Sequence, residues 1–221
     1  MRELPVSNLT EAIRNAFIEA NYTLPEGIRR AVIRAKDRET SPVCQAALQS
    51  NIDNWETAYR ESLPVCQDTG IAVLFLEIGQ DVHFVNGDFR EAVEEGVRRA
   101  YTEGYLRCSV VQDPLRRKNT GDNTPPILHV TITAGDRVRI IAAPKGFGSE
   151  NMSALRMFTP AATKEEIEDF VAETAIRAGS NPCPPILVGV GIGGDFEYCA
   201  CLAKKALLRD PMTDNSDPFY R

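Results

Sequence analysis

Residues 64–78 read PVCQDTGIAVLFLEI, a polar turn that runs directly into an apolar segment, and this stretch decides the fold. Asp68, Thr69 and Gly70 are typical turn formers. The segment IAVLFLEI is apolar on both faces, which is typical of a strand covered from both sides. The turn alone leaves two interpretations of Cys66 open. The thiol packs as a small hydrophobic group, or the loop beside the strand presents it for chemistry.

The chain before this turn, residues 1–62, reads as helical. Apolar side chains recur at helical spacing over residues 12–20 and again over residues 28–35. A third helix is expected from about Ser41 to Glu61, with Ser41 as its N-terminal cap. The N-terminal third is therefore expected to be rich in helix.

Helices and strands are both expected after the apolar strand. The expected elements are a helix at 88–103 capped by Asp88, a β-hairpin of strands 127–133 and 137–143, a helical segment at 151–158, a helix at 164–178 ending at Gly179, a strand at 186–192 and a buried helix at 195–209. The pattern predicts a mixed α/β (α+β) fold, in which a mixed β-sheet covered by helices follows the helix-rich third. We expect one domain over residues 1–209 and a polar, loosely ordered tail over 210–221.

Composition and charge exclude several classes of protein. The chain has 221 residues, 43% of them hydrophobic and 25% charged, as in ordinary globular proteins. Its net charge of −6 and the absence of a basic stripe argue against nucleic acid as a partner. No apolar stretch approaches the roughly 20 residues of a membrane helix, and the N-terminus lacks a signal-peptide core, so we expect a protein of the cytoplasm or an organelle matrix, and take the cytoplasm as the first choice. The six cysteines form no CxxC pair, which argues against zinc-ribbon, thioredoxin and ferredoxin motifs.

Two polar stretches are candidates for binding an anion. Residues 106–126, LRCSVVQDPLRRKNTGDNTPP, form a long loop in which Arg107 could hold a carboxylate through two parallel hydrogen bonds. In residues 145–151, KGFGSEN, Gly146 and Gly148 let the backbone approach a ligand closely, and consecutive N–H groups suit an anion. The second stretch lacks the GK[ST] ending of a P-loop.

A third stretch matches a nucleotide-binding pattern but lacks its context. Gly189, Gly191 and Gly194 fit GxGxxG. No βαβ unit follows, and no acidic residue stands about 20 positions later to hold a ribose. We therefore interpret these glycines as close packing between a strand, a turn and a helix rather than as a nicotinamide site.

Taken in order, the motifs resemble one enzyme family. CQDTG, LRxSVVxDPLxRxNTGDNTP, KGFGSEN, CPPILVGVGIGG and a following AKKALL helix resemble the alpha subunit, or N-terminal half, of the class I iron–sulfur fumarases and the L-tartrate dehydratases. The resemblance implies a hydro-lyase that reversibly dehydrates malate to fumarate, or tartrate to oxaloacetate. It also implies a [4Fe-4S] cluster with three cysteine ligands, whose fourth iron binds substrate.

The resemblance also assigns roles to residues. Cys66 and Cys183 are implied as the first and second cluster ligands, and Asp68 and Arg107 as catalytic residues. The implied substrate-binding residues are Gln67, Asp68, Thr69, Arg107, Lys145, Gly146 and Gly148. In the family, a third cysteine and an active-site histidine follow in a C-terminal continuation, which we expect to be missing here. Cys199 and Cys201 lie two residues apart on the expected last helix, so they point about 200° apart, and we interpret them as core thiols.

The partner implied by the resemblance is a beta subunit, in a homo- or hetero-oligomer. We expect little activity without this beta part. The alternative is a non-catalytic, metal-free scaffold that docks a beta subunit.

Overall fold

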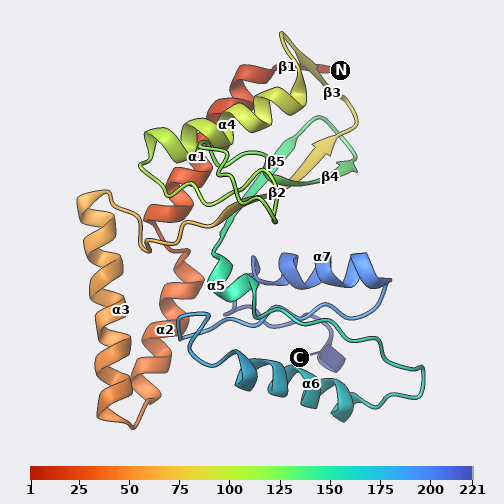
Figure 1. The fold of residues 1–221 in the computed structure, drawn as a ribbon. Coiled ribbons are helices and arrows are strands. Elements are labelled where there is room, and N and C mark those ends of the chain that lie inside the picture. The colour runs from red at the N-terminus through yellow and green to blue at the C-terminus, as the bar shows by residue number, and fades with distance from the viewer. Residues whose placement is uncertain (221) are drawn as a thin grey trace. The chain divides into compact units, whose positions relative to one another are not determined.

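The computed structural model describes residues 1–220, and the chain forms two compact units (Figure 1). Unit 1 consists of Met1–Leu24 and Asp53–Phe147. Unit 2 consists of Pro25–Ile52 and the residues from Gly148 onward. Each unit is therefore built from two separate stretches of the chain.

The centre of unit 1 is a three-stranded mixed sheet, which confirms the predicted fold class. Strand β2 (Ile71–Gly79) is the middle strand. Strand β4 (Ile127–Thr133) pairs with it in parallel, and strand β5 (Val138–Lys145) pairs with it antiparallel on the other side. Ala72, Val73 and Leu74 of β2 are wholly buried, as its unbroken apolar sequence predicted.

The predicted hairpin of residues 127–143 is wrong, because β4 and β5 are not neighbours. β2 lies between them and takes the hydrogen bonds of both. The turn after β4 instead folds over the end of β2, where the N–H groups of Gly79 and Asp81 donate to the carbonyls of Arg137 and Gly135. The central position gives the most apolar strand a partner along both edges.

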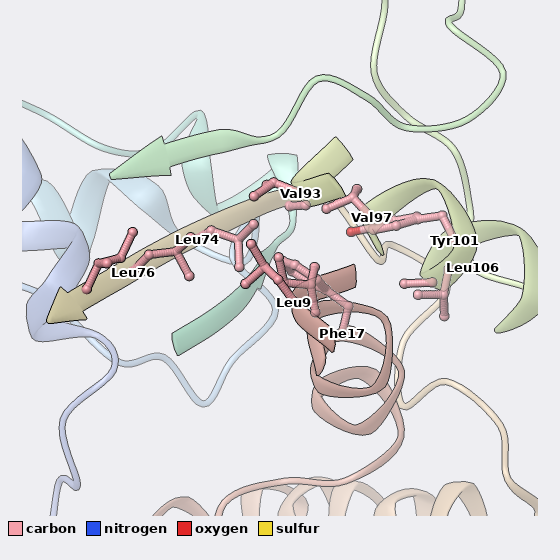
Figure 2. Close-up of a cluster of buried hydrophobic side chains, with 12 residues drawn as sticks. Leu9, Phe17, Leu74, Leu76, Val93, Val97, Tyr101 and Leu106 are labelled. Atoms are coloured by element: carbon pink, nitrogen blue, oxygen red, sulfur yellow. The ribbon is translucent and has the colours of Figure 1, made fainter. Parts of the chain in front are cut away.

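Helices α1 (Val6–Tyr22) and α4 (Phe89–Glu103) pack together to form the core with the sheet. Their buried side chains meet those of β2 in one cluster (Figure 2), which includes Leu9, Phe17, Leu74, Leu76, Val93, Val97, Tyr101 and Leu106. Gly96 lets the two helices approach closely, because a Cβ atom there would lie 2.8 Å from the Thr10 carbonyl oxygen.

A second, two-stranded sheet completes unit 1. Strand β1 (Arg2–Pro5) pairs in parallel with β3 (Val82–Val85), and neither strand was expected from the sequence. The predicted start of α4 is confirmed, since the Asp88 side chain accepts a hydrogen bond from the Glu91 N–H.

The helices expected at 28–35, 41–61 and 164–178 are present. Helix α2 (Glu26–Arg38) lies in unit 2, and α3 (Pro42–Glu61) begins there and ends in unit 1. Helix α6 (Lys164–Ala178) starts at a capping box formed by Thr163 and Glu166. It stops at Gly179, whose φ of 57° favours glycine.

Three expectations for unit 2 are wrong. Residues 186–192 form no strand, because no other described segment pairs with them. Helix α7 (Phe196–Ala206) buries none of its residues, and Cys199 and Cys201 are half-buried rather than core thiols. The segment 151–158 is not helical. A single turn, α5 (Phe147–Glu150), precedes it. Apolar composition alone therefore overestimated regular structure and burial here.

The rest of the described chain adds one short helix, the 3₁₀ turn η1 (Pro218–Tyr220). Within residues 1–220, no helix combines the length and the apolar character that crossing a membrane requires.

Candidate active site

The stretch that opens β2 forms the predicted turn. The Asp68 carboxylate accepts a hydrogen bond from the Gly70 N–H at 3.2 Å, and Gly70 has a φ of 62°. Thr69 is buried with 3% exposure, whereas Cys66 and Gln67 are exposed. The Asp68 N–H donates to the Cys66 sulfur at 3.4 Å. Cys66 is therefore not packed as a small hydrophobic group, and the turn presents its thiol to solvent.

The end of β5 lies against this turn because β2 and β5 are antiparallel, with Ile71 opposite Lys145. The second oxygen of Asp68 accepts a hydrogen bond from the Phe147 N–H at 3.1 Å. A Cβ atom on Gly146 would lie 3.0 Å from that carboxylate, and one on Gly70 would clash with the Lys145 carbonyl. The two glycines thus allow the close contact that brings Asp68, Lys145 and Gly146 together.

Arg107 is held beside the same turn by its backbone. The Thr69 hydroxyl accepts from the Arg107 N–H at 2.9 Å and lies 3.2 Å from the Arg107 carbonyl, to which it can donate. The Arg107 side chain is exposed, and it makes no hydrogen bond or ion pair with any residue between 1 and 220. The backbone of Arg107 is therefore held in place, while its guanidinium group is exposed and can bind a ligand.

Two further residues support this arrangement, and the sequence did not identify either. The Tyr101 hydroxyl donates to the Thr69 carbonyl at 2.9 Å, and burial raises the pKa of this phenol. Asn123 is wholly buried, and its side chain hydrogen-bonds three backbone groups around the turn. Tyr101 continues the apolar face of α4, and Asn123 lies in the GDN part of the long loop. In the sequence, only those positions could have indicated that Tyr101 and Asn123 support the turn.

The other predicted residues belong to unit 2. Cys183 is exposed in a tight turn, with a φ of 56° and its N–H donating to the Ser180 carbonyl at 3.1 Å. Gly148 lies close to this turn, because a Cβ atom there would be 2.9 Å from the Asn181 carbonyl oxygen. The two predicted cluster ligands, Cys66 and Cys183, are thus carried by different units.

The donors that could hold an iron–sulfur cluster are free thiols, the ligand type that such clusters use. Cys66 and Cys183 are both exposed on turns, where a group could reach them. Over residues 1–220, no three His, Cys, Asp or Glu side chains are grouped so that they could hold a metal ion. The donor chemistry of the two thiols fits a cluster, and a third ligand is not assigned.

The glycines of the nucleotide-like motif pack against α7. A Cβ atom on Gly189 would clash with the Ala203 carbonyl, and one on Gly191 would clash with the Cys199 carbonyl. Close packing therefore accounts for these glycines, as we interpreted them from the sequence, although the segment is not a strand.

Comparison with known proteins identifies the family. The family model described as fumarate hydratase (Fumerase) matches residues 10–221. A Methanocaldococcus jannaschii protein, named provisionally as an L(+)-tartrate dehydratase subunit alpha, is 41% identical over 207 residues, which are 91% of this chain and 72% of that protein. The L(+)-tartrate dehydratase subunits alpha of Escherichia coli and Shigella boydii are 29% identical over 211 residues, which are 94% of this chain and 69% of each relative. With its motifs in the expected order and most of its length matched, the chain belongs to the fumarate hydratase (Fumerase) family of hydro-lyases.

Proposed function

We propose that this chain is the alpha subunit, or N-terminal part, of an iron–sulfur hydro-lyase. Its substrate would be a hydroxy-dicarboxylate, which it dehydrates reversibly: malate to fumarate, or tartrate to oxaloacetate. One observation carries the proposal. Asp68, the backbone of Arg107 and the end of β5 are held together within unit 1, and the Arg107 guanidinium is exposed. The names of the relatives support the same class of substrate.

Arg107 would bind one carboxylate of the substrate. A guanidinium group matches a carboxylate with two parallel hydrogen bonds, which fix the orientation of the ligand as well as its position. Because the Arg107 backbone is held by Thr69, the side chain starts from a fixed point. Orientation of this kind lowers the entropic part of the reaction barrier.

Asp68 would orient the other end of the substrate. Both of its carboxylate oxygens already accept backbone N–H groups, from Gly70 and Phe147, so the group cannot rotate freely. Each oxygen keeps a lone pair that can accept a hydrogen bond from a substrate hydroxyl or assist a proton transfer. Gly146 lies against this carboxylate. Gln67, Thr69, Lys145 and Gly148 would complete the proposed substrate site.

Cys66 and Cys183 would supply two thiolate ligands of a [4Fe-4S] cluster. When bound, such a cluster offers an open iron as a Lewis acid that activates the hydroxyl group which leaves. The hydrogen bond from the Asp68 N–H to the Cys66 sulfur would stabilise negative charge on that thiolate. Asp68 would thus lie beside both the cluster and the substrate.

A beta subunit is the proposed partner, in a homo- or hetero-oligomer that supplies the rest of the active site. The names of the relatives, which are alpha subunits, support this assignment. We place the protein in the cytoplasm, where thiols stay reduced, because none of the six cysteines forms a disulfide.

Anaerobic reconstitution of the full chain with a beta partner, iron and sulfide tests the proposal. We expect an absorbance shoulder near about 400 nm from thiolate-bound iron, together with hydration of fumarate or dehydration of tartrate. Exposure to air should abolish the activity. A complex that binds no iron and turns over neither substrate would instead favour the metal-free scaffold.

A further inference from the structure

We propose that Asn123 is a positioning residue that sets the spacing between Asp68 and Arg107, and thereby the affinity of the site for a dicarboxylate. The inference rests on the proposed function. It comes from a side chain that is wholly buried, although it is polar, beside the two residues assigned to the substrate. A buried carboxamide is costly unless its donors and acceptors are used.

The Asn123 side chain joins the two segments that carry those residues. Its oxygen accepts hydrogen bonds from the N–H groups of Ser109 at 2.7 Å and Val110 at 3.0 Å, just after Arg107. Its nitrogen donates to the Gly70 carbonyl at 3.0 Å, just after Asp68. One side chain therefore ties the Arg107 segment to the Asp68 turn.

This tie is the second between the same two segments. The first is the Thr69 hydroxyl, which bonds the Arg107 backbone directly. A single link between two segments acts as a pivot, whereas two links at different points fix both their distance and their angle. Asn123 therefore holds the direction in which the Arg107 side chain leaves the backbone.

Asn123 is itself anchored to the core of unit 1. Its neighbour Asp122 accepts a hydrogen bond from the Arg98 guanidinium on α4 at 3.0 Å and caps the Thr124 N–H at 3.1 Å. Asn123 has a φ of 61°, a left-handed conformation that asparagine and aspartate adopt more readily than other non-glycine residues. The loop thus presents the carboxamide from a fixed backbone.

The test is Asn123→Asp in the full chain, assembled anaerobically with its beta partner. The aspartate keeps both acceptor contacts and places an oxygen opposite the Gly70 carbonyl. It therefore removes the tie to the Asp68 turn and adds a charge at a buried position. The matched control is Asn86→Asp, because Asn86 is exposed and has a similar φ of 66°. The readouts are KM and kcat for the substrate, the equilibrium affinity for succinate as an unreactive dicarboxylate, and the melting temperature.

We expect Asn123→Asp to raise the KM and weaken succinate binding about tenfold, the effect of losing one buried hydrogen bond. The kcat should fall by less than the KM rises. Asn86→Asp should behave as the wild type. A lower melting temperature with unchanged succinate affinity would mean that Asn123 is only structural, and would overturn the inference.

If Asn123→Asp does not assemble, Asn123→Gly decides the question. Glycine adopts the same φ and introduces no buried charge. Glycine loses all three side-chain contacts of Asn123, so a loss of succinate affinity at least as large is expected. Wild-type affinity would overturn the inference. A wild-type complex that neither binds succinate nor turns over substrate would overturn the proposed function itself, so the two failures are distinct.

Discussion

The turn at Asp68 and the turn at Cys183 each carry residues with proposed roles, but the two turns are held in different ways. The Asp68 turn is tied to Arg107, Asn123 and Phe147 by buried and partly buried side-chain hydrogen bonds. The Cys183 turn is exposed, and the apolar residues after it, such as Val188 and Ile192, are 51% and 66% exposed. The comparison teaches that the residues proposed to bind substrate are held in place within unit 1, while Cys183 lies on a sparsely packed segment.

The largest expected effect is at Cys66, the thiol beside Asp68. Cys66→Ser should abolish iron binding and activity, because a serine hydroxyl does not replace a cluster thiolate, while the fold is kept since Cys66 is exposed. Iron and sulfide counts and the melting temperature of the reconstituted complex measure this. Cys44→Ser, at another exposed thiol, is the control. Full iron and activity in Cys66→Ser would remove the residue from the ligand set.

A smaller effect, on the KM, is expected from removing the guanidinium group of Arg107. Arg107→Gln should raise the KM roughly 10- to 100-fold, the range expected for hydrogen bonds between charged groups. Its stability should be unchanged, because the side chain has no partner among the described residues. Arg116→Gln, an exposed arginine in the same loop, serves as the control. Equal KM values for the two variants would contradict the assignment.

The smallest expected effect is on the free energy of unfolding at low pH, and it comes from Asp122, which anchors the long loop at 106–126. Burial alone would raise the pKa of Asp122, but hydrogen bonds from Thr124 and Arg98 outweigh it and lower that pKa below its ordinary value. Asp122 therefore adds stability above its unfolded pKa of about 3.9, and this contribution is lost as the pH falls through the lower, folded pKa. The anchor is partly exposed, so it contributes about 1 kcal/mol or less at pH 6.

Denaturant unfolding of Asp122→Asn and the wild type from pH 6 to pH 3 measures this contribution. The difference in free energy of unfolding should be present at pH 6 and shrink toward pH 3. A difference that stays constant over this range would show that the Asp122 charge does not stabilise the fold.

The sequence predicted most of the helices, though not the irregular segment at 151–158, because helix ends are set by local chemistry. Asp88 and Gly179 mark a start and a stop through contacts within a few residues. The hairpin was wrong because strand pairing joins distant segments, and an apolar strand does not specify its partner. The strand expected at 186–192 failed for the same reason, since it has no described partner.

The site was foreseen in part. Asp68, Arg107, Lys145 and Gly146 lie together in unit 1, and the roles that the resemblance implied for them stay predictions. Tyr101 and Asn123 escaped notice because one reads as part of a helix face and the other as a turn former. Their importance comes from long-range hydrogen bonds that no local pattern encodes.

The order of strands in unit 1 has a consequence for synthesis on the ribosome. β2 emerges first, but Val73 pairs with Ile127 and Ile71 pairs with Lys145, so the strand waits for both partners to be translated. During that delay, an apolar strand with two open edges is exposed to other nascent chains. Because contacts of such wide sequence separation also slow folding, yield in a cell should depend on chaperones that shield residues 71–78 until residue 145 has left the ribosome.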